Sequence, residues 1–174
     1  MSITIEKAHS RPGYLLRVVC EVARPRQEVF DFFSDALQLE RITPPFLNFH
    51  VLTPPPIEMA EGLTIDYRLR VRGFPIRWRS EISLWEPPNR FVDEQRKGPY
   101  SHWHHEHLFE DSDGGTRVID LVHYGVPGGA LLNMLFVRHD LKRIFTYRQD
   151  QMQEILGATH QQWNLAHRAR LNST

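Results

Sequence analysis

The sequence predicts an α+β fold in which an antiparallel sheet of six to seven strands packs against one long C-terminal helix. Short runs of apolar and β-branched residues follow one another between residues 14 and 124. Turn residues such as Gly73-Phe74-Pro75 and Pro87-Pro88-Asn89 separate these runs, which is typical of strands joined by hairpins. After Pro127-Gly128-Gly129 the apolar residues change to helical spacing and keep it to about Leu156.

The first strand is expected over residues 14–22, a run rich in β-branched residues. Pro25 then suits the first turn of a helix, because a proline loses no hydrogen bond there. A second short helix is expected over residues 37–42 and ends before Thr43-Pro44-Pro45, since a residue before proline avoids helical geometry. The apolar face of the first helix is formed by Val29, Phe30, Phe33 and Leu37.

The remaining strands are bounded by proline, glycine and asparagine turns. They are expected over residues 48–53, 63–72, 76–85, 90–95, 100–110 and 116–124. The strand at 63–72 alternates most clearly, so one set of its side chains should face the core. That inward set is Leu63, Ile65, Tyr67, Leu69 and Val71.

The long helix is expected over residues 130–156, with Gly157 as its C-cap. Arg148 falls inside its apolar stripe, so we expect this residue to face the sheet and to contact Asp93 or Asp120. Residues 1–157 would then form one domain, followed by a polar tail over 158–174. The stripe consists of Met134, Val137, Leu141, Ile144, Phe145, Met152 and Ile155.

Composition excludes several classes of protein. The 21 basic and 21 acidic residues cancel, which argues against a nucleic-acid-binding protein. The single cysteine, Cys20, rules out an internal disulfide, fits a reducing compartment and is expected in the core. The N-terminus lacks a signal-peptide pattern, and the apolar stretch at 130–137 is too short for stable membrane insertion. We therefore expect a cytoplasmic protein.

The strand at 100–110 carries the densest group of polar and aromatic residues. Alternation places Trp103, His105, His107 and Phe109 on one face, which indicates a wall that is buried yet not wholly apolar. A concave aromatic wall with a few polar groups is what a small-molecule pocket needs. With inward residues of neighbouring strands and of the long helix, the candidate ligand-binding residues are Tyr67, Asp93, Gln95, Tyr100, Trp103, His105, His107, Asp120, Tyr124, Phe145 and Arg148.

Two interpretations of this polar set remain open. In the first, Arg148 and the histidines satisfy Asp93 and Asp120 as a structural network, because buried charges are usually paired. In the second, part of the set binds a polar group of a ligand. The two are compatible, since a network can brace a cavity and still present one free face.

The His-x-His-His-x-His pattern at 102–107 also raises the possibility of a metal site, with Asp93 or Asp120 as a further ligand. That spacing is not diagnostic, and Trp103 and Phe109 are poor neighbours for a hydrated ion. We predict neither a metal nor a cofactor. His105 beside an aspartate could act as a general acid or base, but no activated nucleophile or phosphate-binding glycine loop is found.

Five arginines are expected on the outer face of one hairpin, where glutamates of neighbouring strands should interleave with them. A solvated sheet face is the simpler interpretation, and an acidic partner is the alternative. The arginines are Arg68, Arg70, Arg72, Arg77 and Arg79, and the glutamates are Glu81, Glu94 and Glu106.

Several segments resemble the SRPBCC group of proteins, which includes START lipid-transfer domains and polyketide cyclase/dehydrases. The matching segments are Trp85-Glu86-Pro87-Pro88-Asn89-Arg90-Phe91-Val92-Asp93-Glu94-Gln95, Gly98-Pro99-Tyr100, Trp103, His105, His107, Phe109, Asp120, Val122, Tyr124 and Ile144-Phe145-Thr146-Tyr147-Arg148. The resemblance is strongest to bacterial ligand-binding SRPBCC proteins. It implies a helix-grip fold, in which a curved sheet wraps the C-terminal helix and encloses a cavity.

By this resemblance the expected function is binding of a small amphipathic or hydrophobic organic ligand between sheet and helix. The alternative is an enzyme of cyclase/dehydrase or hydrolase type that uses a His/Asp acid–base pair in the same cavity. The fold hosts carriers, sensors and enzymes alike. No oligomeric state is predicted.

Overall fold

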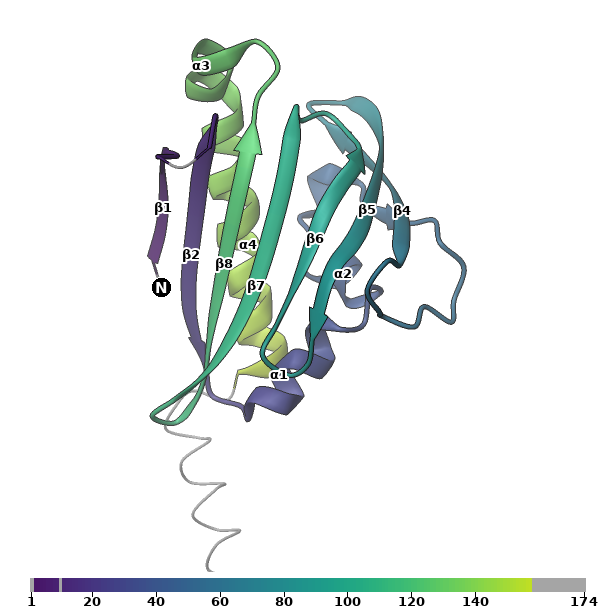
Figure 1. Ribbon diagram of the computed structural model, residues 1–174, viewed down its shortest axis with the longest axis vertical. Coiled ribbons are helices and arrows are strands. Elements are labelled where there is room, and N and C mark those ends of the chain that lie inside the picture. The colour runs from purple at the N-terminus through teal and green to yellow at the C-terminus, as the bar shows by residue number, and fades with distance from the viewer. Residues whose placement is uncertain (1, 10, 158–174) are drawn as a thin grey trace, which may run out of the picture.

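The computed structural model describes residues 2–9 and 11–157 of the 174-residue chain. Eight strands form one antiparallel, curved sheet in the order β1-β2-β8-β7-β6-β5-β4-β3 (Figure 1). The strands are β1 Ser2–Lys7, β2 Tyr14–Val22, β3 His50–Val51, β4 Thr64–Val71, β5 Phe74–Glu86, β6 Arg90–Lys97, β7 His102–Ser112 and β8 Gly115–Gly125.

The helices are gathered into two groups along the chain. Between β2 and β3 lie α1 Arg26–Phe33, α2 Gln38–Arg41 and the short 3-10 helix η1 Pro45–Leu47. After β8 come α3 Gly129–Leu132, a π-helical stretch η2 Asn133–Val137 and α4 Arg138–Leu156. In Figure 1, α4 runs along one face of the sheet, and it contacts β1 and β2. No helix in the described ranges is long and apolar enough to cross a membrane.

The sheet has eight strands, so the prediction of six to seven was too low. The strand that the sequence did not reveal is β1, which pairs with β2 from Ser2↔Val19 to Lys7↔Tyr14. Only Ile5 of β1 is fully buried, so its hydrophobic pattern is weak. At the other edge, the strand expected over 48–53 shrinks to β3, and Asn48, left-handed with φ of 43°, is the C-cap of η1.

The long helix is present but is not α-helical throughout. Its first part changes to π geometry at η2, where buried Asn133 accepts a hydrogen bond from the Tyr124 hydroxyl at 3.0 Å. A π turn shifts the side chains that follow it relative to an α-helical count. Met134, predicted in the apolar stripe, lies within this π stretch and is 66% exposed. Leu37, expected on the apolar face of the first helix, is also exposed.

The core lies between the helices and the concave face of the sheet. One group of buried side chains packs α1 and the end of α4 onto the sheet, around Phe30, Phe109 and Met152. A second group packs the middle of α4 onto β2 and β8, around Val122 and Phe145. The predicted burial of Phe109, Phe145 and Met152 is confirmed. Trp103, which was also expected to be buried, is only half-buried.

The outer face of the β4–β5 hairpin carries exposed arginines, as predicted. Their partners differ from the expected ones, since Arg79 pairs with Asp66 at 2.8 Å while Glu81 and Glu94 pair with Arg96. Arg72 leaves the sheet face, because it occupies the hairpin turn with φ of 50° and pairs with Asp140 of α4 at 2.9 Å. This ion pair joins the hairpin to the helix.

Candidate ligand-binding cavity

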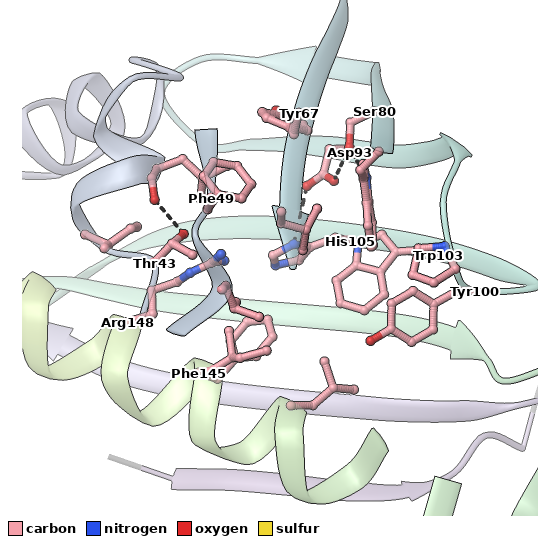
Figure 2. Close-up of a pocket in the computed structure, with 18 of the residues that line it drawn as sticks. Thr43, Phe49, Tyr67, Ser80, Asp93, Tyr100, Trp103, His105, Phe145 and Arg148 are labelled. Carbon is pink, nitrogen blue, oxygen red and sulfur yellow. Dashed lines mark hydrogen bonds and ion pairs between the residues drawn. The ribbon is translucent and has the colours of Figure 1, made fainter. Parts of the chain in front are cut away.

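A cavity of about 420 Å³ lies between the sheet, the α1–α2 segment and α4. Figure 2 shows side chains from all three regions converging on it. Most of its lining is aliphatic or aromatic, and a few polar side chains interrupt it. Such a lining is typical of small-molecule sites, whose volumes run from roughly 300 to 1,000 Å³.

Strand alternation and register explain why polar groups meet on one wall. On β7, His105 and His107 point inward two residues apart. His105 lies opposite Asp93 of β6, and His107 lies opposite Asp120 of β8. Directly opposed side chains on antiparallel strands are close neighbours. The register therefore gathers two aspartates and two histidines, which we call the Asp–His cluster.

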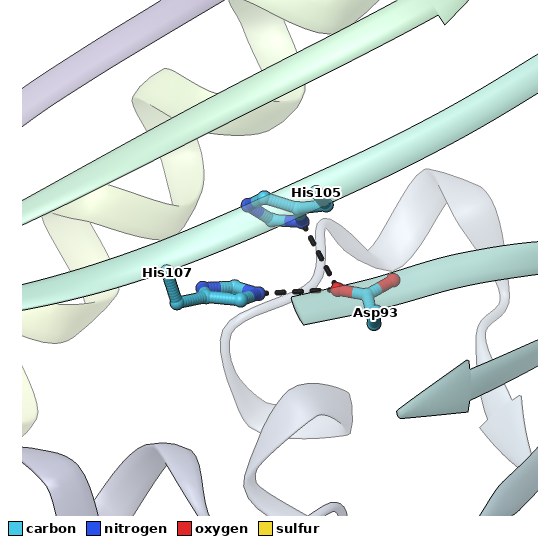
Figure 3. A group of neighbouring side chains, drawn as sticks. All are labelled: Asp93, His105 and His107. Atoms are coloured by element: carbon cyan, nitrogen blue, oxygen red, sulfur yellow. Dashed lines mark hydrogen bonds and ion pairs between the residues drawn. The ribbon is translucent and has the colours of Figure 1, made fainter. Parts of the chain in front are cut away.

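In the Asp–His cluster each imidazole contacts both carboxylates. The two nitrogens of His105 lie 2.9 Å from Asp120 Oδ1 and 3.3 Å from Asp93 Oδ2. The two nitrogens of His107 lie 2.9 Å from Asp120 Oδ1 and 3.2 Å from Asp93 Oδ2. Figure 3 shows one oxygen of the Asp93 carboxylate in contact with a nitrogen of each ring. The histidines thus satisfy both aspartates, as the structural-network interpretation expected.

The pKa shifts follow from this arrangement. Burial on its own would raise the pKa of Asp93 and of Asp120, but hydrogen bonds and charge from His105 and His107 outweigh it and lower both values. Burial would likewise lower the pKa of His105, yet its bonds to the two carboxylates raise it. The Asp–His cluster therefore favours deprotonated Asp93 and Asp120 together with protonated His105.

Asp93, His105 and His107 also offer three possible metal-ligand atoms within 4.8 Å of one another. In this structure Asp93 Oδ2 is hydrogen-bonded to His107 Nε2 and lies 3.3 Å from His105 Nδ1, and the ring centroids of Phe91 and His107 are 4.2 Å apart. The absence of a metal stays a prediction. Elemental analysis of protein purified without an affinity tag tests it, since one equivalent of zinc, iron or copper would overturn it.

Arg148 does not behave as predicted. Among the described residues it has no ion pair or hydrogen bond with Asp93 or Asp120, so the expected contact is wrong. Its Nε is buried and has no hydrogen-bond partner. The guanidinium lies 5.0 Å from the ring centroid of Phe145 and lines the cavity. The histidines of β7 instead make the contacts to Asp93 Oδ2 and Asp120 Oδ1.

An aromatic group closes another part of the cavity. The ring centroids of Trp78 and Trp103 are 5.3 Å apart, and that of Tyr100 lies 5.7 Å from Trp78 and 4.8 Å from Trp103. The side chain of Gln95 fixes the backbone of Tyr100, donating to its carbonyl at 2.8 Å and accepting from its N–H at 3.3 Å. In Figure 2, Tyr100 and Trp103 lie at the opposite end of the site from Arg148.

The structure brings eight of the eleven candidate residues to the cavity wall. They are Tyr67, Asp93, Tyr100, Trp103, His105, His107, Phe145 and Arg148. The other three support the wall from behind: Gln95 holds Tyr100, Asp120 contacts both cluster histidines, and Tyr124 donates to Asn133.

Sequence reasoning missed the part of the lining that comes from outside the central strands. These residues include Phe32, Phe33, Ala36, Leu39, Ile42, Leu47, Phe49, Met59 and Trp78. For Trp78 a signal existed, because alternation along β5 puts it on the same face as Ser80 and Ile82. For the α1–α2 segment, apolar spacing reveals a buried face but not whether that face meets protein or a cavity.

A family model described as "Polyketide cyclase / dehydrase and lipid transport" matches residues 22–146. The chain belongs to this family. The resemblance to SRPBCC proteins is thereby confirmed, and the family suggests ligand binding within this fold. No curated protein matches the chain.

Solved structures with the same fold are numerous. Protein Ms6760 from Mycobacterium smegmatis is 18% identical with a TM-score of 0.65, covering 89% of this chain and 98% of that one. Protein CV1439 from Chromobacterium violaceum is 12% identical with a TM-score of 0.67, covering 85% and 100%. A nucleoside-diphosphate sugar epimerase from Corynebacterium glutamicum is 28% identical with a TM-score of 0.60, covering 79% of this chain but 28% of that one. These similarities support the helix-grip fold.

Proposed function

We propose that this protein binds one small amphipathic organic molecule in the cavity between its sheet and α4. The observation that carries the proposal is the cavity itself, about 420 Å³ of space lined mainly by apolar side chains. A well-packed core of this size would leave few voids larger than a water molecule. Membership of a family described by cyclase, dehydrase and lipid-transport functions supports a ligand of organic character.

The distribution of side chains favours an amphipathic ligand over a purely apolar one. Aromatic residues around Trp78 and Trp103 suit an apolar or aromatic body. Asp93, His105 and Arg148 supply polar groups on the same lining. A few placed polar groups in an apolar pocket fix the orientation of a ligand.

Acid–base catalysis by the Asp–His cluster is the alternative, and the contacts favour it less. His105 is 3% exposed, and a carboxylate oxygen lies near each of its ring nitrogens. A general base needs a nitrogen or oxygen within hydrogen-bond reach of the proton it takes. Because both nitrogens of His105 are occupied, the cluster supports a bracing role for the cavity wall.

Fluorescence titration with N-phenylnaphthylamine, a neutral apolar probe, tests the proposal. Ile144 is half-buried on α4 and lines the cavity, so Ile144→Trp should fill part of it and weaken binding of the probe. Ile155 is also half-buried on α4 but packs on the core outside the lining, so Ile155→Trp is the matched control and should bind like wild type. Equal binding by all three proteins would contradict the proposal.

A further inference from the structure

Arg148 is the feature of the cavity that packing does not explain. It lies on α4 between two buried residues, Phe145 and Gln149, and its guanidinium lines the cavity. Figure 2 shows it extending from the helix towards the space between Thr43 and His105. Its Nε is buried without a hydrogen-bond partner. The residue as a whole is half-buried, and a buried nitrogen of a charged group is rarely left without a partner.

The other carboxylates that line the cavity are already engaged. Asp93 contacts both histidines of the Asp–His cluster, and its other oxygen accepts a hydrogen bond from Ser80 at 3.3 Å. Asp140 pairs with Arg72 at 2.9 Å.

Asp35, the remaining carboxylate of the lining, accepts hydrogen bonds from the backbone N–H of Leu37 and from the amide of Gln38. Within residues 2–9 and 11–157, Arg148 is therefore a lining cation with no carboxylate within ion-pair distance.

The surrounding charges compensate Arg148 only at longer range. Burial lowers the pKa of Arg148, and the attraction of Asp120, Asp93 and Tyr67 offsets this only in part. The fold thus holds a guanidinium at a net electrostatic cost. A residue that costs stability and faces a ligand cavity is well placed for recognition.

We infer that the ligand carries a carboxylate group and that Arg148 binds it, with the apolar body of the ligand directed towards Trp78, Tyr100 and Trp103. This inference rests on the proposed binding function and assigns the ligand a chemical class, an amphipathic organic acid. The planar guanidinium fork matches a carboxylate with two parallel N–H···O bonds.

A singly charged group fits better than a phosphate. One guanidinium balances one carboxylate, whereas a phosphate monoester carries about −1.5 to −2 charges near neutral pH. The excess negative charge would lie in the same cavity as Asp93, close to Asp120 behind it. A neutral ligand group would leave Arg148 with only the longer-range attraction of Asp120, Asp93 and Tyr67.

Pyrenebutyric acid and its methyl ester, titrated by fluorescence, test the inference, because the two probes differ in one ionisable group. Wild type should bind the acid more tightly than the ester. Arg148→Met should weaken binding of the acid by at least about tenfold, the range for hydrogen bonds to charged groups, and leave binding of the ester within about twofold. Arg143→Met is the matched control, since Arg143 is an exposed arginine of α4 that stacks on Phe46 outside the cavity lining.

The outcomes separate the inference from the function on which it rests. If wild type binds acid and ester equally, or if Arg148→Met binds the acid as wild type does, the cavity binds a ligand but the inference is wrong. If wild type binds neither probe, the proposed function fails and the inference fails with it. A loss of acid binding in Arg143→Met equal to that in Arg148→Met would also overturn the assignment, because surface charge alone would then explain it.

Discussion

Replacing Asp120 with asparagine should strongly destabilise the protein. Asp120 is 1% exposed, and its Oδ1 lies 2.9 Å from a nitrogen of each cluster histidine. Asp120→Asn keeps the shape of the side chain and removes its charge. The imidazolium of His105 would then retain Asp93 alone as a counter-charge, at 3.3 Å.

Removal of one partner of a buried ion pair costs about 3–5 kcal/mol. The amide oxygen of asparagine still accepts a hydrogen bond, so the lower end, about 3 kcal/mol, is the expected cost for Asp120→Asn. For a domain of this size each kcal/mol lowers the melting temperature by about 2–4 °C. The expected fall in melting temperature is therefore about 6–12 °C.

The pH dependence of this cost follows from the signs of the shifts. The lowered pKa of Asp120 stabilises the fold above the ordinary carboxyl pKa, and that stabilisation is lost as pH falls through the lowered value. The raised pKa of His105 stabilises the fold below the ordinary imidazole pKa, about 6.5, and that stabilisation is lost as pH rises through the raised value. The difference in unfolding free energy between Asp120→Asn and wild type should be largest near pH 6. It should become smaller towards alkaline pH.

Urea unfolding at several pH values measures this difference. Asp66→Asn is the matched control, because Asp66 is another sheet aspartate whose partner, Arg79, lies on the solvent face. Surface ion pairs contribute little to stability, so Asp66→Asn should have nearly the same unfolding free energy as wild type at every pH. If Asp120→Asn were as stable as Asp66→Asn, or if its deficit did not change with pH, the Asp–His cluster would not hold the charges assigned to it.

Three further predictions concern other parts of the fold. Burial raises the pKa of the Cys20 thiol to about 12, so iodoacetamide should label it only on unfolding; rapid labelling of folded protein would contradict its burial. Gly13→Ala should lower the melting temperature more than Gly62→Ala. Both glycines have positive φ, but only at Gly13 would a Cβ meet the Tyr124 carbonyl oxygen. Equal decreases in melting temperature would contradict this reasoning, because backbone strain alone would then explain them. Arg148→Met should unfold at the same or a higher urea concentration than wild type, because burial disfavours the charged guanidinium; a loss of about 3 kcal/mol would reveal a partner within the fold.

The sequence predicted most of the fold because its strands are half-buried and alternate. β2 was predicted with its observed bounds, and the inward faces of β4 and β7 follow from a period of two residues. The strand Ser2–Lys7 was not predicted, because an edge strand needs little apolar surface. The apolar spacing did not reveal the π stretch of the long helix, in which Asn133 accepts a hydrogen bond from Tyr124.

The sequence predicted which residues line the candidate site better than it predicted the contacts among them. Alternation places Asp93, His105 and His107 on one inner wall, and the structure has them there. Which groups pair with one another depends on strand register, which determines that the histidines contact both carboxylates. Without that register, Asp93 or Asp120 was the expected partner of Arg148. In the structure both cluster histidines contact both aspartates, and Arg148 forms an ion pair with neither.

Native mass spectrometry of the freshly purified protein tests the central claim most directly. The account predicts that purified wild-type protein carries one small organic molecule per chain. If the protein is purified without a bound molecule, it should bind N-phenylnaphthylamine in a one-to-one ratio. The account also predicts that Ile144→Trp, with its cavity partly filled, does neither, while Ile155→Trp behaves as wild type. A wild-type protein that stays bare with excess probe, or a complex of equal abundance in Ile144→Trp, would contradict a ligand-binding cavity.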